Sequence, residues 1–209
     1  MNQLKLSFIT FFNKFSDRCS FVIFIAKIAF FSLLLLFCIL AGSYKLGKPL
    51  LYFNNTSSAP RGIYIASFDK HYDYDDFYIV RLDRDYNLLK KGTFLLKQIK
   101  GKPGDIYISQ YDHLDLNGHR YLIRDDKRLP HMPYGSYRIQ DDYYMMLNER
   151  DDSFDGRYIG PTKQDYLVQE VWLLVNRDYL FEKQKALLET VFSTFPLLKN
   201  YIIIPQITN

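Results

Sequence analysis

The chain has 209 residues, of which 48% are hydrophobic and 17% aromatic, which is enough for one domain with its own core and accessory segments. Its net charge of +4 does not indicate a nucleic-acid-binding protein. Residues 1–48 hold five Lys, one Arg and one Asp, a net of +5, which leaves −1 for the rest of the chain. The excess of basic residues therefore belongs to the amino-terminal end.

The first predicted element is a transmembrane helix. The sequence is apolar from Phe21 to Gly42 apart from one lysine and one serine, and about 20 apolar residues span a bilayer. We predict a helix over Phe21–Tyr44, between a cytoplasmic segment of residues 1–20 and an extracytoplasmic domain of residues 45–209. A cleavable signal peptide is the alternative, but its apolar core has only about 7–15 residues, and no small-x-small cleavage site follows this stretch.

The distribution of basic residues favours a cytoplasmic amino terminus by one charge, since three precede the span and two follow it: Lys5, Lys14 and Arg18 against Lys45 and Lys48. Both cysteines lie within the first 38 residues, so the domain of residues 45–209 has no disulfide. The four histidines show no metal-ligand spacing, and we expect no metal or cofactor.

Short alternating or aromatic-rich runs in the remaining chain predict strands. These are Ile63–Phe68, Phe77–Leu82, Thr93–Ile99, Asp105–Ser109, Arg120–Ile123, Tyr143–Leu147 and Val168–Val175. Asn117-Gly118, between two apolar runs, is typical of a two-residue hairpin turn. The segment Arg177–Leu198 changes to helical periodicity and is limited by Pro196 and Pro205. We therefore predict a mainly β domain that ends in a helix.

A segment with a polar or special residue at every second position, NNTSSAPRG, runs from Asn54 to Gly62. Proline restricts φ and glycine permits turns closed to other residues, so Ser58 is expected on a stiff, shaped loop. A serine beside Pro and Gly is most often part of a turn. A rigid loop also suits a nucleophile, and the adjacent Ser57 breaks the alternating pattern.

A lysine follows in the segment LLKQIKGKPGD, from Leu95 to Asp105. The alternation puts Lys97 on one strand face with Leu95 and Ile99, whereas the nearby Lys100 is expected to be solvated. Most strand lysines point to solvent. A lysine in apolar surroundings instead has a pKa lowered towards neutrality, where it can accept a proton.

These two segments resemble the membrane-bound leader peptidases of the signal peptidase I class, and within it the TraF-type conjugative-transfer peptidases. In that family, N-x-T-x-S-x-P-x-G carries the nucleophile and a lysine before G-x-PGD is the general base. The resemblance assigns these roles to Ser58 and Lys97, and it implies coiled antiparallel β-sheets. Thr56 matches the position whose hydroxyl helps the backbone amide of Ser58 to stabilise the oxyanion.

A third segment, RDDSFDGRYIGP at Arg150 to Pro161, resembles the family's box S-x-D-[SG]-R-Y-x-G. The resemblance implies that Ser153 hydrogen-bonds the lysine and that Asp155 and Arg157 form an orienting ion pair. Without the resemblance, these two residues would be interpreted as a surface ion pair, which contributes little to stability. The three segments follow the family's order and cover about half of the chain, from Asn54 to Pro161.

Two departures point away from the general secretory enzymes and towards the conjugative branch. General signal peptidases carry Gly-Asp-Asn where Leu147-Asn148-Glu149 stands, and Met where Ala59 follows the serine. The resemblance thus implies a serine endopeptidase in the bacterial cytoplasmic membrane, with its catalytic domain on the periplasmic face. Its expected substrate is an exported precursor, a conjugative pilin, with hydrolysis or pilin cyclisation as the outcome.

Two alternatives stay open. The first is a non-catalytic membrane component of a pilus or secretion assembly that retains the peptidase fold, although the intact residues of all three segments speak against it. The second is a general signal peptidase that serves many exported proteins.

Overall fold

The computed structural model describes residues 2–86 and 89–194, with no side chains described for residues 2–20, 188 and 191–194. The chain divides into two compact units, Met1–Leu50 and Leu51–Asn209. Each is described by itself. The last four residues of the expected carboxyl-terminal helix, and both prolines expected to limit it, lie outside the described residues.

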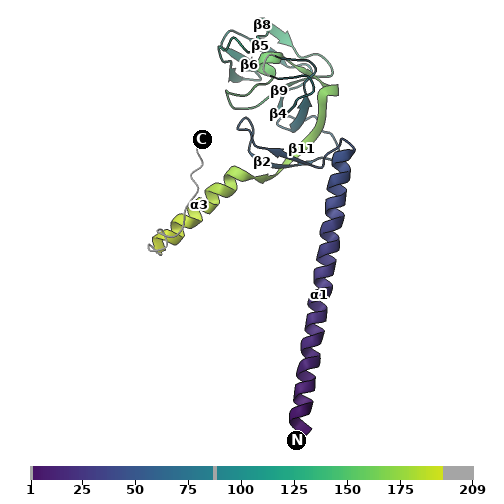
Figure 1. The fold of residues 1–209 in the computed structure, drawn as a ribbon. Coiled ribbons are helices and arrows are strands. Elements are labelled where there is room, and N and C mark those ends of the chain that lie inside the picture. Colours follow the sequence, from purple (N-terminus) through teal and green to yellow (C-terminus); the bar gives the residue numbers. More distant parts are fainter. Residues whose placement is uncertain (1, 87–88, 195–209) are drawn as a thin grey trace. The chain divides into compact units, whose positions relative to one another are not determined.

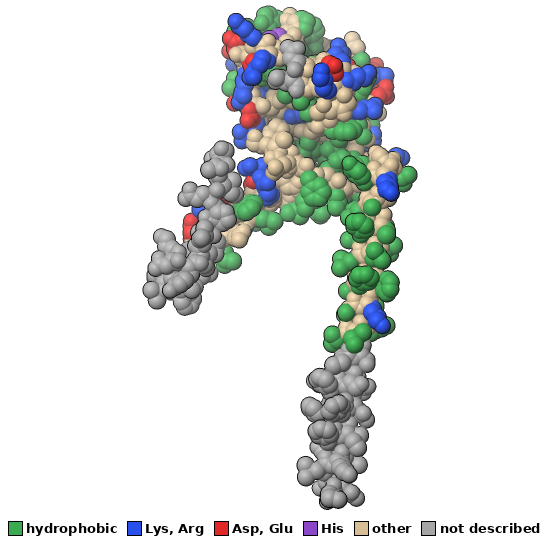
Figure 2. All heavy atoms as spheres, viewed as in Figure 1, with side chains coloured by type: hydrophobic (Ala, Val, Ile, Leu, Met, Phe, Trp, Pro, Cys, Tyr) green, Lys and Arg blue, Asp and Glu red, His purple; other side chains and the backbone are tan. Residues whose placement is uncertain are grey.

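The first unit contains one continuous helix, α1 (Asn2–Lys45) (Figure 1). Its segment Phe21–Lys45 is apolar and long enough to cross a membrane, and its bounds agree with the predicted span within one residue. Figure 2 shows hydrophobic side chains over the described length of this segment. The same helix continues through residues 2–20 of the expected amino-terminal segment.

The second unit contains two antiparallel sheets in its described part. The larger has the order β1-β2-β11-β3-β4-β9-β10, with strands Leu51–Asn54, Gly62–Ala66, Leu167–Asn176, Phe77–Arg81, Phe94–Gly101, Tyr143–Leu147 and Thr162–Lys163. The smaller has the order β7-β6-β5-β8, with strands His119–Leu122, His113–Leu116, Ile106–Ser109 and Gly135–Arg138. Figure 1 shows the smaller sheet beside β4 and β9. The unit also contains the short helix α2 (Gly156–Ile159), the 3₁₀ turn η1 (Gln164–Tyr166) and α3 (Arg177–Thr194).

Strand β9 is buried on both faces and joins two parts of the core. Met145 and Leu147 pack in a cluster with side chains of the smaller sheet, whereas Tyr144 and Met146 pack in a second cluster with residues of β3, β4 and β11. This explains why the run Tyr143–Leu147 is continuously apolar instead of alternating, as is usual for strands covered on both sides. The site residues described below lie on and directly after these central strands.

The predicted fold class is confirmed: a mainly β domain of curled antiparallel sheets, with an apolar helix before it and a helix after it. Each of the seven predicted strand segments matches an observed strand with shifts of one or two residues at some ends. The hairpin is also present, since Leu116 pairs with His119 and the turn residues Asn117 and Gly118 have φ of 51° and 79°.

Candidate active site

Residues 55–61, called the serine loop below, join β1 to β2 and carry Ser58. The side chain of Asn54, the last residue of β1, holds this loop from within. Its Nδ2 donates to three loop carbonyl oxygens at 3.1 Å each, and its Oδ1 accepts from the backbone N–H of Thr56 at 3.1 Å and from its hydroxyl at 2.7 Å. Ser58 Oγ lies 3.4 Å from Thr56 Oγ1. One amide side chain thus sets the shape of the loop.

Two contacts fix the end of the serine loop. The hydroxyl of Tyr64 donates to the carbonyl oxygen of Pro60 at 2.7 Å. At Gly62, where φ is 157°, a Cβ atom would lie 1.9 Å from the carbonyl oxygen of Val175, so only glycine fits where β11 passes. Asn54, Thr56, Pro60 and Gly62 of the alternating motif therefore each take part in a contact that shapes the loop around Ser58.

Lys97 lies in the middle of β4 and is paired with Tyr78 of β3. Its face of the strand is buried, as the alternation predicts, and the residue is only 4% exposed. Loss of hydration on burial lowers the pKa of Lys97 from its ordinary 10.5 to about 8, against an opposing effect of the nearby Asp155 carboxylate. At pH 8 about half of the Lys97 amines are therefore neutral and have a lone pair that can accept a proton.

Lys97 Nζ donates a 2.7 Å hydrogen bond to Ser153 Oγ, and both residues are buried. Ser153 is held by its backbone, which donates to the carbonyl oxygen of Arg150 at 3.2 Å. The structure thus brings together the lysine of the second sequence segment and the serine of the third.

Asp155 and Arg157 form a salt bridge of 2.8 Å in which both side chains are fully buried, so they are no surface pair. Asp155 caps α2 by accepting from the backbone N–H of Arg157, and it also accepts from the backbone N–H of Asn148 at 3.1 Å. Arg157 in turn donates to the carbonyl oxygens of Asn148 at 2.6 Å and Leu122 at 3.1 Å. The pair therefore fixes the chain directly after β9 and ties it to the smaller sheet.

A cavity of about 390 Å³ opens at Ser58, and Gln98 and Asn148 also line it. Lys97 is not among the lining residues. Among the described residues, no hydrogen bond joins Ser58 Oγ to Lys97 Nζ. The structure thus brings Thr56 to Ser58, Ser153 to Lys97 and Asp155 to Arg157, whereas no contact between Ser58 and Lys97 is found among the described residues.

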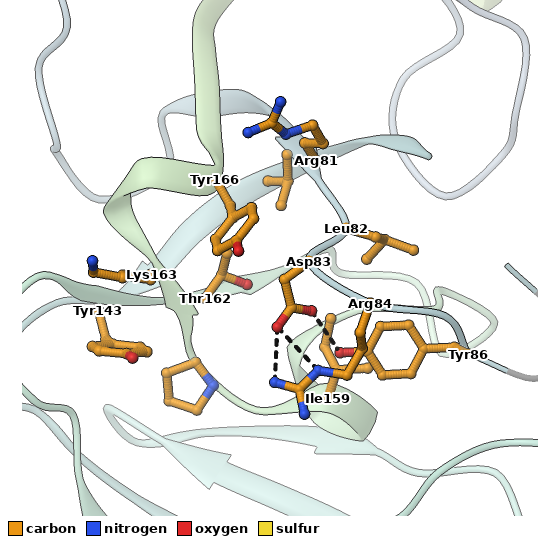
Figure 3. A pocket seen from close by; sticks show the side chains of 12 residues that line it. Arg81, Leu82, Asp83, Arg84, Tyr86, Tyr143, Ile159, Thr162, Lys163 and Tyr166 are labelled. Atoms are coloured by element: carbon orange, nitrogen blue, oxygen red, sulfur yellow. Dashed lines mark hydrogen bonds and ion pairs between the residues drawn. The ribbon is translucent and has the colours of Figure 1, made fainter. Parts of the chain in front are cut away.

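A separate cavity of about 260 Å³ contains none of the predicted site residues (Figure 3). Tyr86, Tyr143 and Tyr166 line it, together with Arg84, whose guanidinium is paired with Asp83 at 2.8 Å. The cavity at Ser58 contains the predicted nucleophile and is therefore the candidate active site.

Several contacts of the site were not predicted. Asn54 is the first residue of the alternating motif, but the sequence does not indicate that its side chain hydrogen-bonds the serine loop. Asn148 stands out in the sequence only as a departure from the family pattern, and in the structure its Nδ2 donates to the carbonyl oxygen of Leu96 at 3.0 Å. Lys100 is expected to be solvated, but its side chain is mostly buried in ion pairs with Asp75 and Glu149. The pairing of β4 with β9 places it near Glu149, and a backbone hydrogen bond from Asp75 to Ile99 holds Asp75 beside β4.

Comparison with known proteins assigns the class. The family model described as "Signal peptidase, peptidase S26" matches residues 25–175, and the chain belongs to this family of serine endopeptidases that remove signal peptides.

Among solved structures, the chain is similar to the crystal structure of a signal peptidase I from Enterococcus faecalis. The two share 20% sequence identity with a TM-score of 0.32, over 50% of this chain and 98% of that one. A search of curated proteins found no match.

Proposed function

We propose that this signal peptidase cleaves its substrate with Ser58 as nucleophile and Lys97 as general base. Neutral Lys97 takes the hydroxyl proton of Ser58 as Ser58 Oγ attacks the scissile carbonyl carbon. The lysine then gives this proton to the leaving amine, and an acyl-enzyme remains on Ser58. Water, deprotonated by the same lysine, then attacks the ester carbonyl; the C–O bond to Ser58 breaks, the lysine returns the proton to Ser58 Oγ, and the carboxylic acid product is released.

The burial of Lys97 is the observation that supports this proposal most directly. A lysine with an ordinary pKa is almost wholly protonated at neutral pH and cannot act as a base, whereas a pKa of about 8 leaves a usable neutral fraction. The neutral amine has two N–H groups and one lone pair. The hydrogen bond to Ser153 engages one N–H and leaves the lone pair for Ser58.

Thr56 and the backbone N–H of Ser58 are the proposed oxyanion donors. In the structure the Thr56 hydroxyl donates to Asn54 Oδ1, so it must rotate its proton away from Asn54 to stabilise the oxyanion. In this mechanism Asp155 and Arg157 contact neither Ser58 nor the amine of Lys97, and Ser153 contacts only the amine. Ser153 orients the lysine, and the buried ion pair fixes the chain after β9 that lines the cavity.

The proposed subclass is the TraF-type conjugative-transfer peptidases, with a pilin precursor as substrate. The residues at two places support it, namely Ala59 directly after the serine and the run Leu147-Asn148-Glu149 at the end of β9. In this branch the amino terminus of the substrate can replace water and resolve the acyl-enzyme to a cyclic pilin. No metal or cofactor takes part in the proposed chemistry.

The proposed topology has residues 1–20 in the cytoplasm, one span over Phe21–Tyr44 in the bacterial inner membrane, and the peptidase domain of residues 45–209 in the periplasm. The short chain between the span and Ser58 can extend at most about 50 Å. A substrate still held in the bilayer would then present its cleavage site to Ser58 directly.

The decisive experiment is intact-mass spectrometry of a candidate pilin precursor co-expressed with the wild type, Ser58→Ala or Ser57→Ala. We expect a shortened product with the wild type and with the Ser57 control, and the uncut precursor with Ser58→Ala. A product mass one water below that of the linear form identifies cyclisation. Equal processing by wild type and Ser58→Ala overturns the assignment and favours a non-catalytic role in a pilus or secretion assembly.

A further inference from the structure

The first residue of α3 contacts both ends of the serine loop. Asn176, at the end of β11, pairs with Gly62, so Arg177 follows directly beside the point where the loop ends. Its backbone N–H donates to the carbonyl oxygen of Arg61 at 2.8 Å. Its guanidinium Nη1 donates to the side-chain oxygen of Asn55 at the other end of the loop. Arg177 therefore bridges the two ends of the segment that carries Ser58.

The next residue adds a second connection. Asp178 forms an ion pair of 3.2 Å with Arg61, the last residue of the serine loop. Their side chains are 45% and 30% exposed, respectively, so water screens the pair only in part. Both residues line the cavity that contains Ser58. Asp178 thus lies in the wall of the candidate active site and is connected to its loop.

The start of α3 cannot shift freely relative to the loop. The Oδ1 of Asn176 caps the helix by accepting from the backbone N–H of Tyr179 at 3.0 Å. A Cβ on Gly62 would lie 3.3 Å from the backbone nitrogen of Arg177, which shows how closely the two segments approach. The Nε–H of Arg177 is buried and has no hydrogen-bond partner among the described residues, so the contact with Asn55 is what directs this side chain.

From these contacts we propose that Arg177 and Asp178 are positioning residues for the nucleophile. Asn54 hydrogen-bonds the serine loop from within, and the first turn of α3 contacts both of its ends, so that together they fix the position of Ser58. The family match ends at residue 175, two residues before this turn, so the contribution comes from a helix beyond the matched segment. The inference rests on the proposed role of Ser58.

The test uses the full-length protein in detergent micelles and a precursor with small residues before its cleavage site. For Arg177→Gln and for Asp178→Asn we expect kcat to fall about 10- to 100-fold, because small displacements of a reacting group are costly, with KM within about twofold of wild type. Lys185→Gln and Glu189→Gln remove the same charges from exposed positions of the same helix and are expected to leave both constants unchanged.

Three further readouts separate positioning from a loss of fold. The midpoint of the pH–rate profile, which reports Lys97, is expected to stay unchanged in both variants. The exchanged pair Arg61→Asp with Asp178→Arg is expected to recover kcat at least fivefold over Asp178→Arg alone. A purely structural role instead lowers the melting temperature and the folded fraction while kcat per folded molecule stays at the wild-type value, and that result overturns the inference.

Two other outcomes are distinguishable. If wild type cleaves the precursor, Ser58→Ala does not, and both helix variants retain kcat within twofold, the proposed function stands and the positioning role is wrong. If wild type and Ser58→Ala both leave the precursor uncut, or both cut it, the proposed function fails and the inference fails with it.

Discussion

Lys97 donates a 2.7 Å hydrogen bond to Ser153, although the two residues come from different segments of the sequence and meet only through the pairing of β4 with β9. Both residues are buried, and the lysine has a pKa lowered to about 8 by the loss of hydration. A buried amine with a single side-chain hydrogen bond and a lowered pKa is a group prepared to accept a proton. If Lys97 is the base of the proposed reaction, its pKa is measurable in the pH dependence of cleavage.

The first prediction concerns pH. Below a pKa of about 8 Lys97 is protonated and has no lone pair, so kcat/KM should fall about tenfold for each pH unit below that value and reach a plateau above it. The measurement is the initial rate of precursor cleavage between about pH 6 and 10. A profile without an inflection between about pH 7 and 9 contradicts the assignment of Lys97 as base.

The second prediction tests whether the Ser153 hydroxyl orients the amine of Lys97. Ser153→Ala leaves Lys97 without its side-chain partner, and a hydrogen bond to a charged or polarised group contributes about 1.5–3 kcal/mol. We expect kcat to fall about 10- to 100-fold and KM to change little, because the lysine is misoriented while the substrate cavity is intact. Ser57→Ala, in the exposed turn of the serine loop, is the matched control and should keep the wild-type rate.

The buried ion pair allows a prediction of stability. Asp155→Asn leaves the fully buried Arg157 guanidinium without its carboxylate, a change that typically costs about 3–5 kcal/mol. The exposed pair of Lys163 and Asp165 is the comparison, and Asp165→Asn is expected to cost at most about 1 kcal/mol. The quantity to measure is the free energy of unfolding of the full chain in detergent. Equal effects of the two substitutions would show that the Asp155 pair is not a structural support.

Lys97→Met separates function from stability. At pH 7 Lys97 is mostly protonated despite its burial, and the difference between a pKa of 10.5 and one of about 8 corresponds to about 3 kcal/mol. Because the folded-state pKa is depressed, the unfolded chain holds the proton more tightly. The wild type therefore gains stability as the pH rises from about 8 to 10.5, and it carries the full penalty below that range.

Methionine removes this penalty without leaving a large void. Lys97→Met is expected to abolish cleavage and to raise the free energy of unfolding by about 1–3 kcal/mol at pH 7, since the lost bond to Ser153 offsets part of the gain. The gain should shrink as the pH is raised above 8. A variant that is both inactive and less stable than wild type at pH 7 argues against a destabilised, buried base.

The sequence could predict the features that depend on local pattern. The alternation around Lys97 predicts its buried face, and the run Tyr143–Leu147 predicts a strand, because both signals are local. Strand β8 gives no such signal, since three of its four residues are exposed, and β1 is a four-residue edge strand. Helix α2 has only four residues and depends on its cap by Asp155.

Contacts set by strand register could not be predicted in the same way. Lys100 meets Glu149 because β4 pairs with β9 through an irregular register, and its second partner, Asp75, adopts a φ of 69°. The contact of Arg177 with the serine loop depends on the pairing of β11 with β2 beyond a register shift between Leu173 and Val175. No local pattern contains the register of two strands that are more than 100 residues apart.

The last prediction concerns the residue that shapes the serine loop. Asn54→Asp keeps the size of the side chain and the acceptor oxygen for Thr56, but it replaces the Nδ2 donor of three hydrogen bonds with a second oxygen that faces three carbonyls. We expect the loop to lose its shape, kcat to fall about 100-fold or more, and the melting temperature to fall by a few degrees.

Gln184→Glu is the control, because it makes the same amide-to-carboxylate change at an exposed position of α3. Cleavage rates and melting temperatures of both variants, measured at pH 8, check the prediction. Lowering the pH towards 4 protonates the introduced carboxyl group and restores one donor, so the melting temperature of Asn54→Asp should approach that of wild type there. A pH-independent difference between the two would show that charge and donor loss at this position are not what disturbs the loop.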